Sequence, residues 1–286
     1  MEFSILIPTL NNINYLKICI NSIKKNSKYK HEILVHSNNS IDQTSSFLEE
    51  NNIKEIKSDK NYGLCTALNQ LAEKAKNDFL LFLHDDMYIC PDWEDALINE
   101  IKSHNHVNFY LTGIMIEKTN GHINYNFGNT YLDFNEKNLL EKYKSFQHYD
   151  IQGADKNPSL IHKSIWKNVG GMSKEFNPGD GSDPDFIYKL WISGIRIFKG
   201  LSNFRVYHFG SITTRKNKSI NLNNGSKIFL KKWGFSHKFL RKYYLKSDTQ
   251  FTAPLKDPTK NIFFYIDLLK CKFKLFYINF FASEEK

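Results

Sequence analysis

The feature of this sequence that most constrains its fold is an alternation of strand-like and helix-like segments over the first hundred residues. Short runs rich in Ile, Leu, Val and Phe fall at 3–8, 32–35, 53–56 and 79–83. Segments with apolar side chains at helical spacing follow the first three runs. This alternation predicts an α/β fold, in which a mixed, mainly parallel sheet is covered by helices on both faces.

Polar clusters directly follow three of the predicted strands. They occupy residues 9–12, 37–39 and 84–86. In an open α/β sheet, ligands bind at the carboxyl ends of the strands. We therefore expect these clusters to meet at one edge of the sheet and to form a binding site there.

The most informative cluster holds two adjacent carboxylates, Asp85 and Asp86, after the most apolar strand. Adjacent carboxylates repel each other unless a cation neutralises them. Oxygen ligands of this kind suit Mg²⁺ or Mn²⁺, which are typically shared with a substrate's phosphates. The alternative is an exposed turn that caps the helix beginning near Asp92. The neighbouring His84 is either a further ligand or a structural hydrogen-bonding residue.

A second acidic cluster lies in the Gly-rich segment 179–185. Asp183 and Asp185 stand at the start of a predicted helix, where carboxylates commonly complement the helix dipole. A carboxylate at such a place could also act as a general base if burial or a neighbouring charge tunes its pKa. His208 follows another predicted strand, and it either joins a metal site or makes only loop hydrogen bonds.

The middle of the chain is less regular. Residues 107–116 form a good strand, and 123–127 could pair with it across Asn120-Gly121 as a hairpin. Residues 128–150 have poor periodicity, so we predict an irregular segment there. Two further short strands are expected at 195–198 and 204–207.

Five motifs in order along the chain resemble those of family 2 glycosyltransferases with the GT-A fold. They are Ser4–Asn12, Asn38–Thr44, Asn61–Leu64, Phe79–Asp86 and the stretch from Gly170 to Asp185. Each motif alone is loose, but five in the right order are specific. The resemblance covers roughly residues 1–210. It implies an inverting enzyme that moves a sugar from a nucleotide-diphosphate sugar, with a UDP-sugar favoured.

The resemblance also implies roles for individual residues. Asp86 and His208 would be metal ligands for Mn²⁺ or Mg²⁺, and Asp183 would be the catalytic base, with Asp185 beside it in the catalytic motif. The acceptor would be a hydroxyl of a glycan or a lipid-linked molecule, in surface polysaccharide or glycoconjugate synthesis. The implied lining of the nucleotide-sugar pocket is Pro8, Thr9, Asn11, Ser37, Asn38, Asn61, Gly63 and Asp85.

Three positions depart from the family pattern. Ser37 stands where an acidic residue usually contacts the base, His84 where a first Asp is common, and Ser182 where Glu usually precedes the catalytic Asp. These departures leave open a degenerate homologue that binds the donor without turnover. A sugar nucleotidylyltransferase is a weaker alternative, because 9–12 lacks a Gly-rich basic loop.

The net charge of +9 raises a further alternative, a nucleic-acid-binding protein. No recognisable nucleic-acid-binding motif supports it, so we expect no nucleic-acid partner. Much of the positive charge lies after residue 212, which predicts a catalytic domain at 1–211 (donor half 1–110, acceptor half 111–211) and a basic helical extension at 212–286.

The aromatic segment 262–281 has two interpretations. It is either a helix in peripheral contact with a membrane or a helix packed on the catalytic domain or a second subunit. The start of the chain has no basic leader, and its four scattered cysteines suit a reducing compartment, so the predicted location is cytoplasmic, with membrane contact on the cytoplasmic face. The oligomeric state is not predicted.

Overall fold

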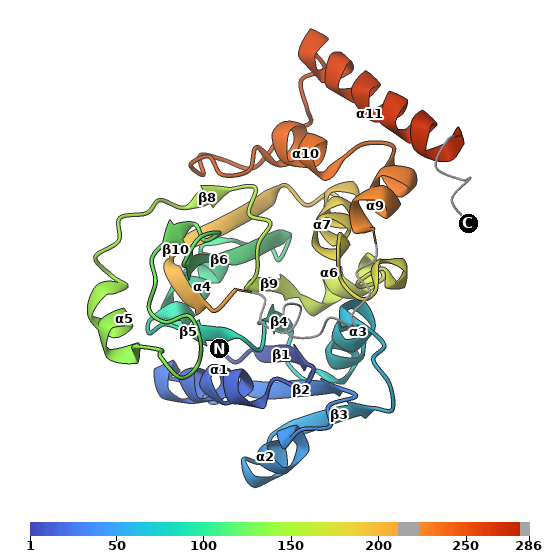
Figure 1. Ribbon diagram of the computed structural model, residues 1–286. Coiled ribbons are helices and arrows are strands. Elements are labelled where there is room, and N and C mark those ends of the chain that lie inside the picture. The colour runs from blue at the N-terminus through green and yellow to red at the C-terminus, as the bar shows by residue number, and fades with distance from the viewer. Residues whose placement is uncertain (211–223, 281–286) are drawn as a thin grey trace.

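A computed structural model describes residues 1–210 and 224–280 (Figure 1). Its centre is a ten-stranded sheet. The strands are β1 (Ser4–Thr9), β2 (Glu32–Asn38), β3 (Lys54–Ser58), β4 (Phe79–Phe82), β5 (Met87–Ile89), β6 (Phe109–Glu117), β7 (Ile123–Asn124), β8 (Ile151–Gln152), β9 (Ser159–His162) and β10 (Ile197–His208). The helices are α1 (Ile13–Asn26), α2 (Thr44–Glu50), α3 (Leu64–Lys74), α4 (Trp93–Ser103), α5 (Glu136–Lys142), α6 (Lys163–Asn168), η1 (Lys174–Phe176), α7 (Ser182–Ile192), α9 (Gly225–Trp233), α10 (His237–Phe239), the π-helical η2 (Leu240–Leu245) and α11 (Ile262–Phe280).

The sheet confirms the predicted α/β class. Its main path runs β3-β2-β1-β4-β9-β6-β10-β5, with β7 beside β6 and β8 beside β10. The first four strands of this path are parallel, whereas β9 is antiparallel to both of its neighbours. The carboxyl ends of β1, β2 and β4 therefore meet at one edge, as the sequence predicts.

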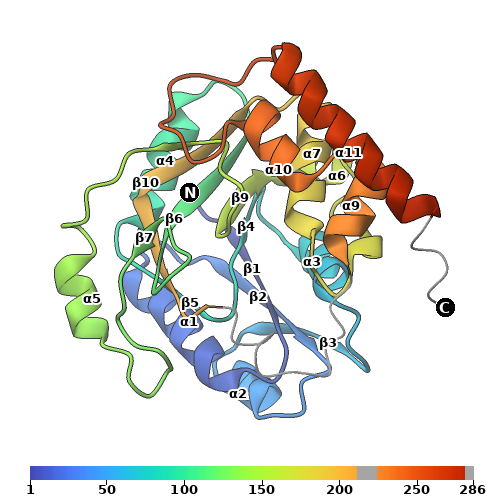
Figure 2. The ribbon, with the colours of Figure 1, turned by 45° about the horizontal axis from the view of Figure 1, so that its top comes forward.

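The two faces of the sheet carry separate apolar cores because successive side chains of a strand point to opposite faces. Ile5, Ile7 and Leu81 pack with α1 and α4. Leu6 and Leu80 pack on the other face with α3, α6 and α7 (Figure 2). The central strands are consequently buried on both sides, which explains their continuous apolar runs.

Three local predictions need correction. β7 pairs with β6 in parallel, not as a hairpin, because the backbone N–H of His122 donates to the carbonyl of Met115 at 2.8 Å and turns the chain back before it pairs. The segment 128–150 contains α5, whose single buried apolar residue, Leu139, leaves no visible periodicity. The two short strands after 195 are one strand, β10, with a register shift between Leu201 and Arg205.

The C-terminal helices pack on the same side of the sheet as α7. Phe229 of α9, Phe239 of α10 and Phe264 of α11 belong to the same buried cluster as Leu6 and Leu80 of the sheet. Across residues 1–210 and 224–280, none of the helices combines the length and apolar character that a membrane span requires.

Candidate active site

The carboxyl ends of β1 and β4 are joined by a short hydrogen bond between two predicted site residues. The hydroxyl of Thr9 donates to Oδ2 of Asp85 at 2.6 Å, and both side chains are buried. Burial, followed by the nearby Asp86 carboxylate, raises the pKa of Asp85 to about 7, although the bond from Thr9 lowers it. Asp85 is thus held in place at this edge by its bond from Thr9.

The end of β2 organises the next part of this edge. The Asn38 side chain donates to Oδ1 of Asn61 at 2.6 Å and accepts from the backbone N–H of Tyr62 at 2.8 Å. Oδ1 of Asn61 also accepts from the backbone N–H of Gly63 at 2.9 Å. These bonds fix the loop between β3 and α3 against β2.

Two neighbouring loops complete the edge. Asn11 adopts a left-handed backbone with φ of 50° and accepts from the backbone N–H of Ile41 at 2.8 Å. Pro8, half-buried in β1, stands in register with His36 of β2. Gly63 has φ of 83°, and a Cβ there would lie 2.4 Å from Oδ1 of Asn177, so only glycine permits this close approach.

Ser37, at the end of β2, is hydrogen-bonded to a carboxylate of the neighbouring strand β3. Its hydroxyl donates to Oε1 of Glu55 at 2.5 Å, and Ser45 donates to the same oxygen at 2.7 Å. The second carboxylate oxygen of Glu55 lies 3.4 Å from Nζ of Lys57. A carboxylate from β3 therefore lies within hydrogen-bonding distance of Ser37. Sequence analysis missed Glu55 because it looks like an ordinary polar residue of a short strand.

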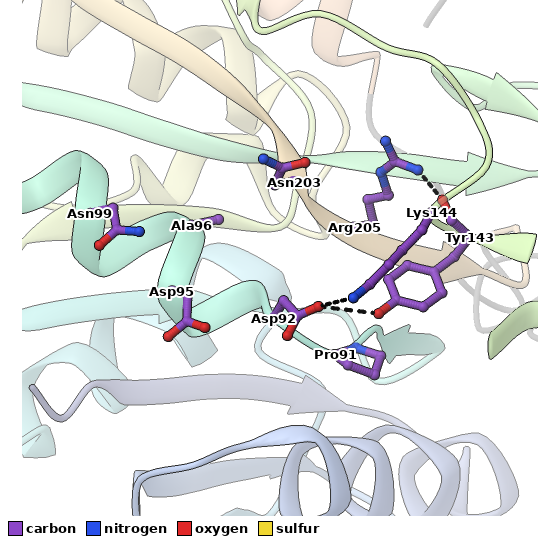
Figure 3. Close-up of a pocket in the computed structure, with 9 residues that line it drawn as sticks. All are labelled: Pro91, Asp92, Asp95, Ala96, Asn99, Tyr143, Lys144, Asn203 and Arg205. Carbon is purple, nitrogen blue, oxygen red and sulfur yellow. Dashed lines mark hydrogen bonds and ion pairs between the residues drawn. The ribbon is translucent and has the colours of Figure 1, made fainter. Parts of the chain in front are cut away.

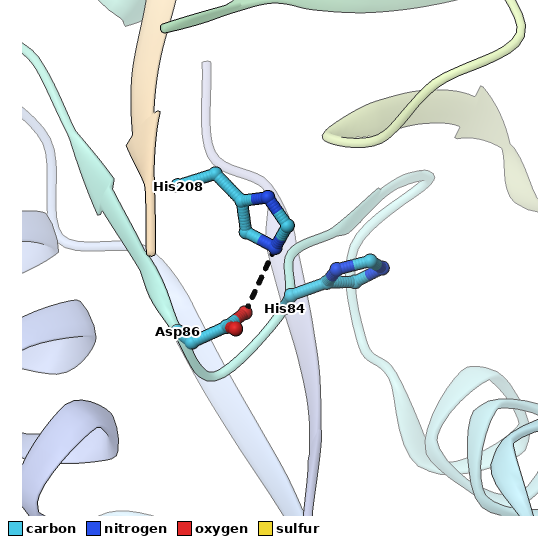
Figure 4. A group of neighbouring side chains, drawn as sticks. All are labelled: His84, Asp86 and His208. Carbon is cyan, nitrogen blue, oxygen red and sulfur yellow. Dashed lines mark ion pairs between the residues drawn. The ribbon is translucent and has the colours of Figure 1, made fainter. Parts of the chain in front are cut away.

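Three side chains form a compact group just beyond Asp85 (Figure 4). His84, Asp86 and His208 each offer a ligand atom, and these atoms all lie within 4.8 Å of one another. Nε2 of His208 lies 3.2 Å from Oδ1 of Asp86. His84 and Asp86 come from the loop after β4, and His208 ends β10, which pairs antiparallel with β5. Strand pairing therefore brings together residues more than a hundred positions apart.

The charges in this group fit a cation. Burial, reinforced by the nearby His208, lowers the pKa of His84 to about 4, which leaves a neutral imidazole available as a ligand. Burial lowers the pKa of His208, but the carboxylates of Asp86 and Glu117 outweigh it and raise that pKa to about 10. The two carboxylates stabilise a positive charge beside them. In place of a proton on His208, a divalent ion would supply that charge. A donor set of two imidazoles and a carboxylate can hold a divalent metal ion.

Glu117 is a second residue that sequence analysis missed. It ends β6, is buried, and its Oε2 lies 2.8 Å from Nδ1 of His208. This contact leaves Nε2 of the ring facing Asp86. An acidic residue closing an otherwise apolar strand was the available signal.

Asp183 lies close to this group through one intervening side chain. Nδ2 of Asn157 lies 3.4 Å from Oδ2 of Asp183 and 3.4 Å from Nε2 of His84. Burial raises the pKa of Asp183 to about 6, with the Asn157 hydrogen bond opposing and the charge of Asp155 assisting. A carboxyl group with this pKa is largely ionised at neutral pH and can accept a proton.

Asp185 occupies a different environment although it is only two residues away, because positions two apart on a helix face different directions. Its buried carboxylate lies 2.8 Å from Nζ of Lys232 and accepts from the indole of Trp233 at 2.8 Å. The structure thus places Asp183 near the group of His84, Asp86 and His208, which we call the metal-type group, and Asp185 against α9.

A separate pocket of about 420 Å³ opens at the other end of the β5–β10 pair (Figure 3). Asp92 there pairs with Lys144 at 2.6 Å, and Arg205 donates to the backbone carbonyls of Ser202, Tyr143 and Phe146. These charged groups are already engaged with one another and with the backbone, so the pocket adds no reactive group to the site.

Comparison with known proteins places the chain in a family. The model of the family "Glycosyl transferase family 2" matches residues 4–168, more than half of the chain, and the protein therefore belongs to this family and is a glycosyltransferase. No curated protein matches the sequence.

Solved structures of similar fold agree with this assignment. TarS 1–349 from S. aureus is 16% identical with a TM-score of 0.58, and the alignment covers 99% of this chain and 74% of that one. GalNAc-T7, solved with UDP, GalNAc and Mn²⁺, is 17% identical with a TM-score of 0.57, covering 73% of this chain and 44% of that one. At these identities the likeness shows the shared GT-A fold.

Proposed function

We propose that this glycosyltransferase moves a sugar from a nucleotide-diphosphate sugar, with a UDP-sugar favoured, to a hydroxyl of a glycan or lipid-linked acceptor. The observation that carries the proposal is the placement of Asn157 between His84 of the metal-type group and the carboxylate of Asp183. The proposed cation-binding group and the proposed base thus lie on either side of the Asn157 side chain. TarS structures solved with UDP and with UDP-GlcNAc support the choice of donor.

The donor would lie along the carboxyl ends of β1, β2 and β4. Asp85, already held by Thr9, would bind the ribose or a phosphate. The remaining lining would be the side chains and backbone that surround it, namely Pro8, Thr9, Asn11, Ser37, Asn38, Asn61 and Gly63. Glu55, bonded to Ser37, supplies an acceptor for an N–H group of the nucleotide base.

His84, Asp86 and His208 would hold a divalent cation, Mn²⁺ or Mg²⁺. Such an ion supplies positive charge that stabilises a departing diphosphate. Glu117 holds the ring of His208 so that its Nε2 faces Asp86.

Asp183 would act on the acceptor. Its carboxylate takes the proton from the acceptor hydroxyl as that oxygen forms a bond to the anomeric carbon, and the bond from this carbon to the diphosphate oxygen breaks, with its electron pair leaving on the nucleotide diphosphate. Attack from the side opposite the leaving group inverts the configuration. Asp185 would contribute indirectly, since its contacts with Lys232 and Trp233 hold the helix that carries Asp183.

A thermal-shift panel tests the donor and the cation together. Each of several nucleotide sugars is added with and without Mn²⁺, and a ligand that binds only the folded protein raises its melting temperature. We expect a shift for uridine nucleotides that grows with Mn²⁺ and disappears in Asp86→Asn. No response to any nucleotide sugar in either condition would exclude the proposal.

A turnover assay separates the enzyme from a degenerate homologue. Release of the nucleotide diphosphate is measured with the donor identified by the panel and a set of glycan and lipid-linked acceptors. If the donor binds but no nucleotide diphosphate is released with any acceptor, and none by slow hydrolysis of the donor either, the protein is the donor-binding homologue without turnover. The active transferase would serve surface polysaccharide or glycoconjugate synthesis. Its proposed location is the cytoplasm, a reducing compartment that suits its four free, buried cysteines.

A further inference from the structure

The last helix, α11, exposes a large apolar and aromatic surface. We call this surface the aromatic face. It consists of side chains that are each between 43% and 66% exposed, namely Ile262, Phe263, Tyr265, Ile266, Leu269, Phe273, Phe276, Tyr277 and Phe280. Contiguous exposed apolar surface of this kind marks an interaction site.

The aromatic face lies opposite the side of α11 that packs on the protein. Phe264 and Cys271 are buried, and Leu268, Leu275 and Ile278 pack against the same core cluster. At about 100° per residue, these positions centre on one side of the helix, and Leu269 and Phe273 point the opposite way. Figures 1 and 2 both show α11 at the outside of the molecule, and none of the other helices and strands described within 1–210 and 224–280 lies on its outer side. The helix is therefore apolar on two opposite sides.

Exposed lysines border the aromatic face on both edges. Lys270 and Lys274 lie along one edge, and Lys272 lies along the other. Lys272 thus sits at the margin of the face and does not interrupt its centre. Within 262–280 the one acidic side chain is Asp267, which lies 2.7 Å from Nζ of Lys242 and 3.0 Å from Nζ of Lys270.

We propose that α11 lies in the plane of an anionic lipid bilayer, with the aromatic face in the acyl boundary and the bordering lysines at the headgroups. An apolar face flanked by lysines is the arrangement of in-plane amphipathic helices. Nineteen residues extend about 28 Å at 1.5 Å per residue, which is long enough for a continuous contact along the surface.

The charges favour lipid over a second copy of the chain. Two copies paired through their aromatic faces would bring bordering lysines together. Asp267, the only acid of the helix, already pairs with Lys242 and Lys270 and leaves Lys272 and Lys274 without a counter-charge from α11. Anionic headgroups would neutralise the same lysines, and each lysine would increase the affinity for the vesicle roughly fivefold. A spanning orientation does not suit α11, because Asp267 and three lysines interrupt it.

This inference stands without the proposed donor or reaction, because it rests on α11 alone. Its functional consequence does rest on the proposed function. α11 contacts α9, and Lys232 of α9 pairs with Asp185 of α7. A bilayer under α11 would therefore set the position of Asp183 relative to a lipid-linked acceptor.

Vesicle flotation tests the inference directly. The whole protein is mixed with neutral phosphatidylcholine vesicles and with vesicles that contain phosphatidylglycerol. We expect binding to the anionic vesicles and at least tenfold weaker binding to the neutral ones. Equal binding to both, or to neither, would overturn the proposal.

Paired variants assign the binding to the aromatic face. Leu269→Ser with Phe273→Ser should reduce vesicle affinity at least tenfold, and the matched control Ile41→Ser with Leu132→Ser should not, although those side chains are 87% and 80% exposed. All four positions are exposed, so melting temperatures should be unchanged. Undiminished binding by the α11 variant would contradict the proposal.

A lysine variant and a mass measurement close the test. Replacing Lys270, Lys272 and Lys274 together with Gln should remove most of the preference for anionic vesicles, about a hundredfold in affinity. Sedimentation without lipid should show no self-association that depends on Leu269 and Phe273. A dimer that these substitutions dissociate, without vesicle binding by the wild type, would replace the lipid with a second copy.

Discussion

Oε2 of Glu117 lies 2.8 Å from Nδ1 of His208, and Nε2 of the same ring lies 3.2 Å from Oδ1 of Asp86. The carboxylate of Glu117 thus orients the imidazole, and the carboxylate of Asp86 contacts the opposite ring nitrogen. Outer carboxylates of this kind fix ring orientation in metal sites. Sequence reasoning gave Glu117 no role, yet the geometry makes it the support of a predicted ligand.

The first prediction concerns this support. Glu117→Ala should weaken Mn²⁺ binding by roughly 10- to 100-fold, because the ring of His208 loses its orienting partner. Isothermal titration calorimetry with Mn²⁺ measures the effect on the protein alone. Glu141→Ala, an exposed acidic position with 60% side-chain exposure, is the matched control. Equal affinity in both variants would show that Glu117 only fills space.

The second prediction separates the base from the binding groups. Asp183→Asn should lower kcat about a thousandfold, because the amide cannot accept the acceptor's proton. The dissociation constant of UDP should stay within a factor of two or so of the wild-type value, since Asp183 lies on the other side of Asn157 from His84. Asp257→Asn, at a side chain 80% exposed, controls for loss of a charge. Near-normal turnover by Asp183→Asn would remove it from the mechanism.

The third prediction is a pH dependence. The base is active when ionised, and the pKa of Asp183 is raised to about 6, so kcat/KM should fall about tenfold per pH unit below that value. The Asn157 hydrogen bond lowers this pKa, so Asn157→Ala should move the acidic limb to higher pH. A profile measured from pH 5 to 8 decides the matter. An acidic limb that stays in place in Asn157→Ala would argue against Asp183 as the titrating group.

The fourth prediction distinguishes Asp185 from Asp183 by stability. Asp185→Ala removes the buried partner of Lys232 and leaves the indole N–H of Trp233 without its acceptor, so it should reduce the free energy of unfolding by about 2 kcal/mol. Glu175→Ala removes an exposed carboxylate from the same lysine, Lys232, and should cost less than about 1 kcal/mol. Urea unfolding measures both. Similar losses in the free energy of unfolding for the two variants would mean that the contacts of Asp185 contribute no more to stability than the exposed pair of Glu175 does.

The fifth prediction concerns the base of the nucleotide. Glu55→Gln should weaken UDP binding by about tenfold, since it removes a charged acceptor bonded to Ser37. Binding of a nucleotide that the enzyme does not prefer should change much less. Calorimetry with UDP and ADP, alongside Lys57→Gln as a neighbouring control, measures the difference. An equal loss for both nucleotides would show a general effect on the pocket.

The sequence predicts the sheet edge well, because it depends on local patterns. The strand at 79–83 is continuously apolar and ends abruptly at His84, so both its burial and its exit are visible in the residue order. The contacts of Glu117 and Asn157 are not visible in this way. Each depends on which strands or loops are neighbours in space, and β10 reaches β6 and β5 only through pairings between distant segments.

The same limit applies to Asp183 and Asp185. Both stand in one short acidic stretch, and nothing in the residue order says which faces the site. Lys232 and Trp233 decide this from about fifty positions away, by drawing Asp185 toward α9. A helix that lies outside the matched family segment therefore holds one of the two neighbouring carboxylates, and the sequence pattern alone does not show this.

The Lys232–Asp185 pair also bears on how far this chain can be divided. A chain cut after residue 211, where sequence patterns place the end of the catalytic domain, would keep the buried Asp185 and lose its counter-charge. The cut would also uncover core surface now filled by Phe229 and Phe239. The described part of the extension, 224–280, thus shares its apolar core and a buried ion pair with the rest of the transferase.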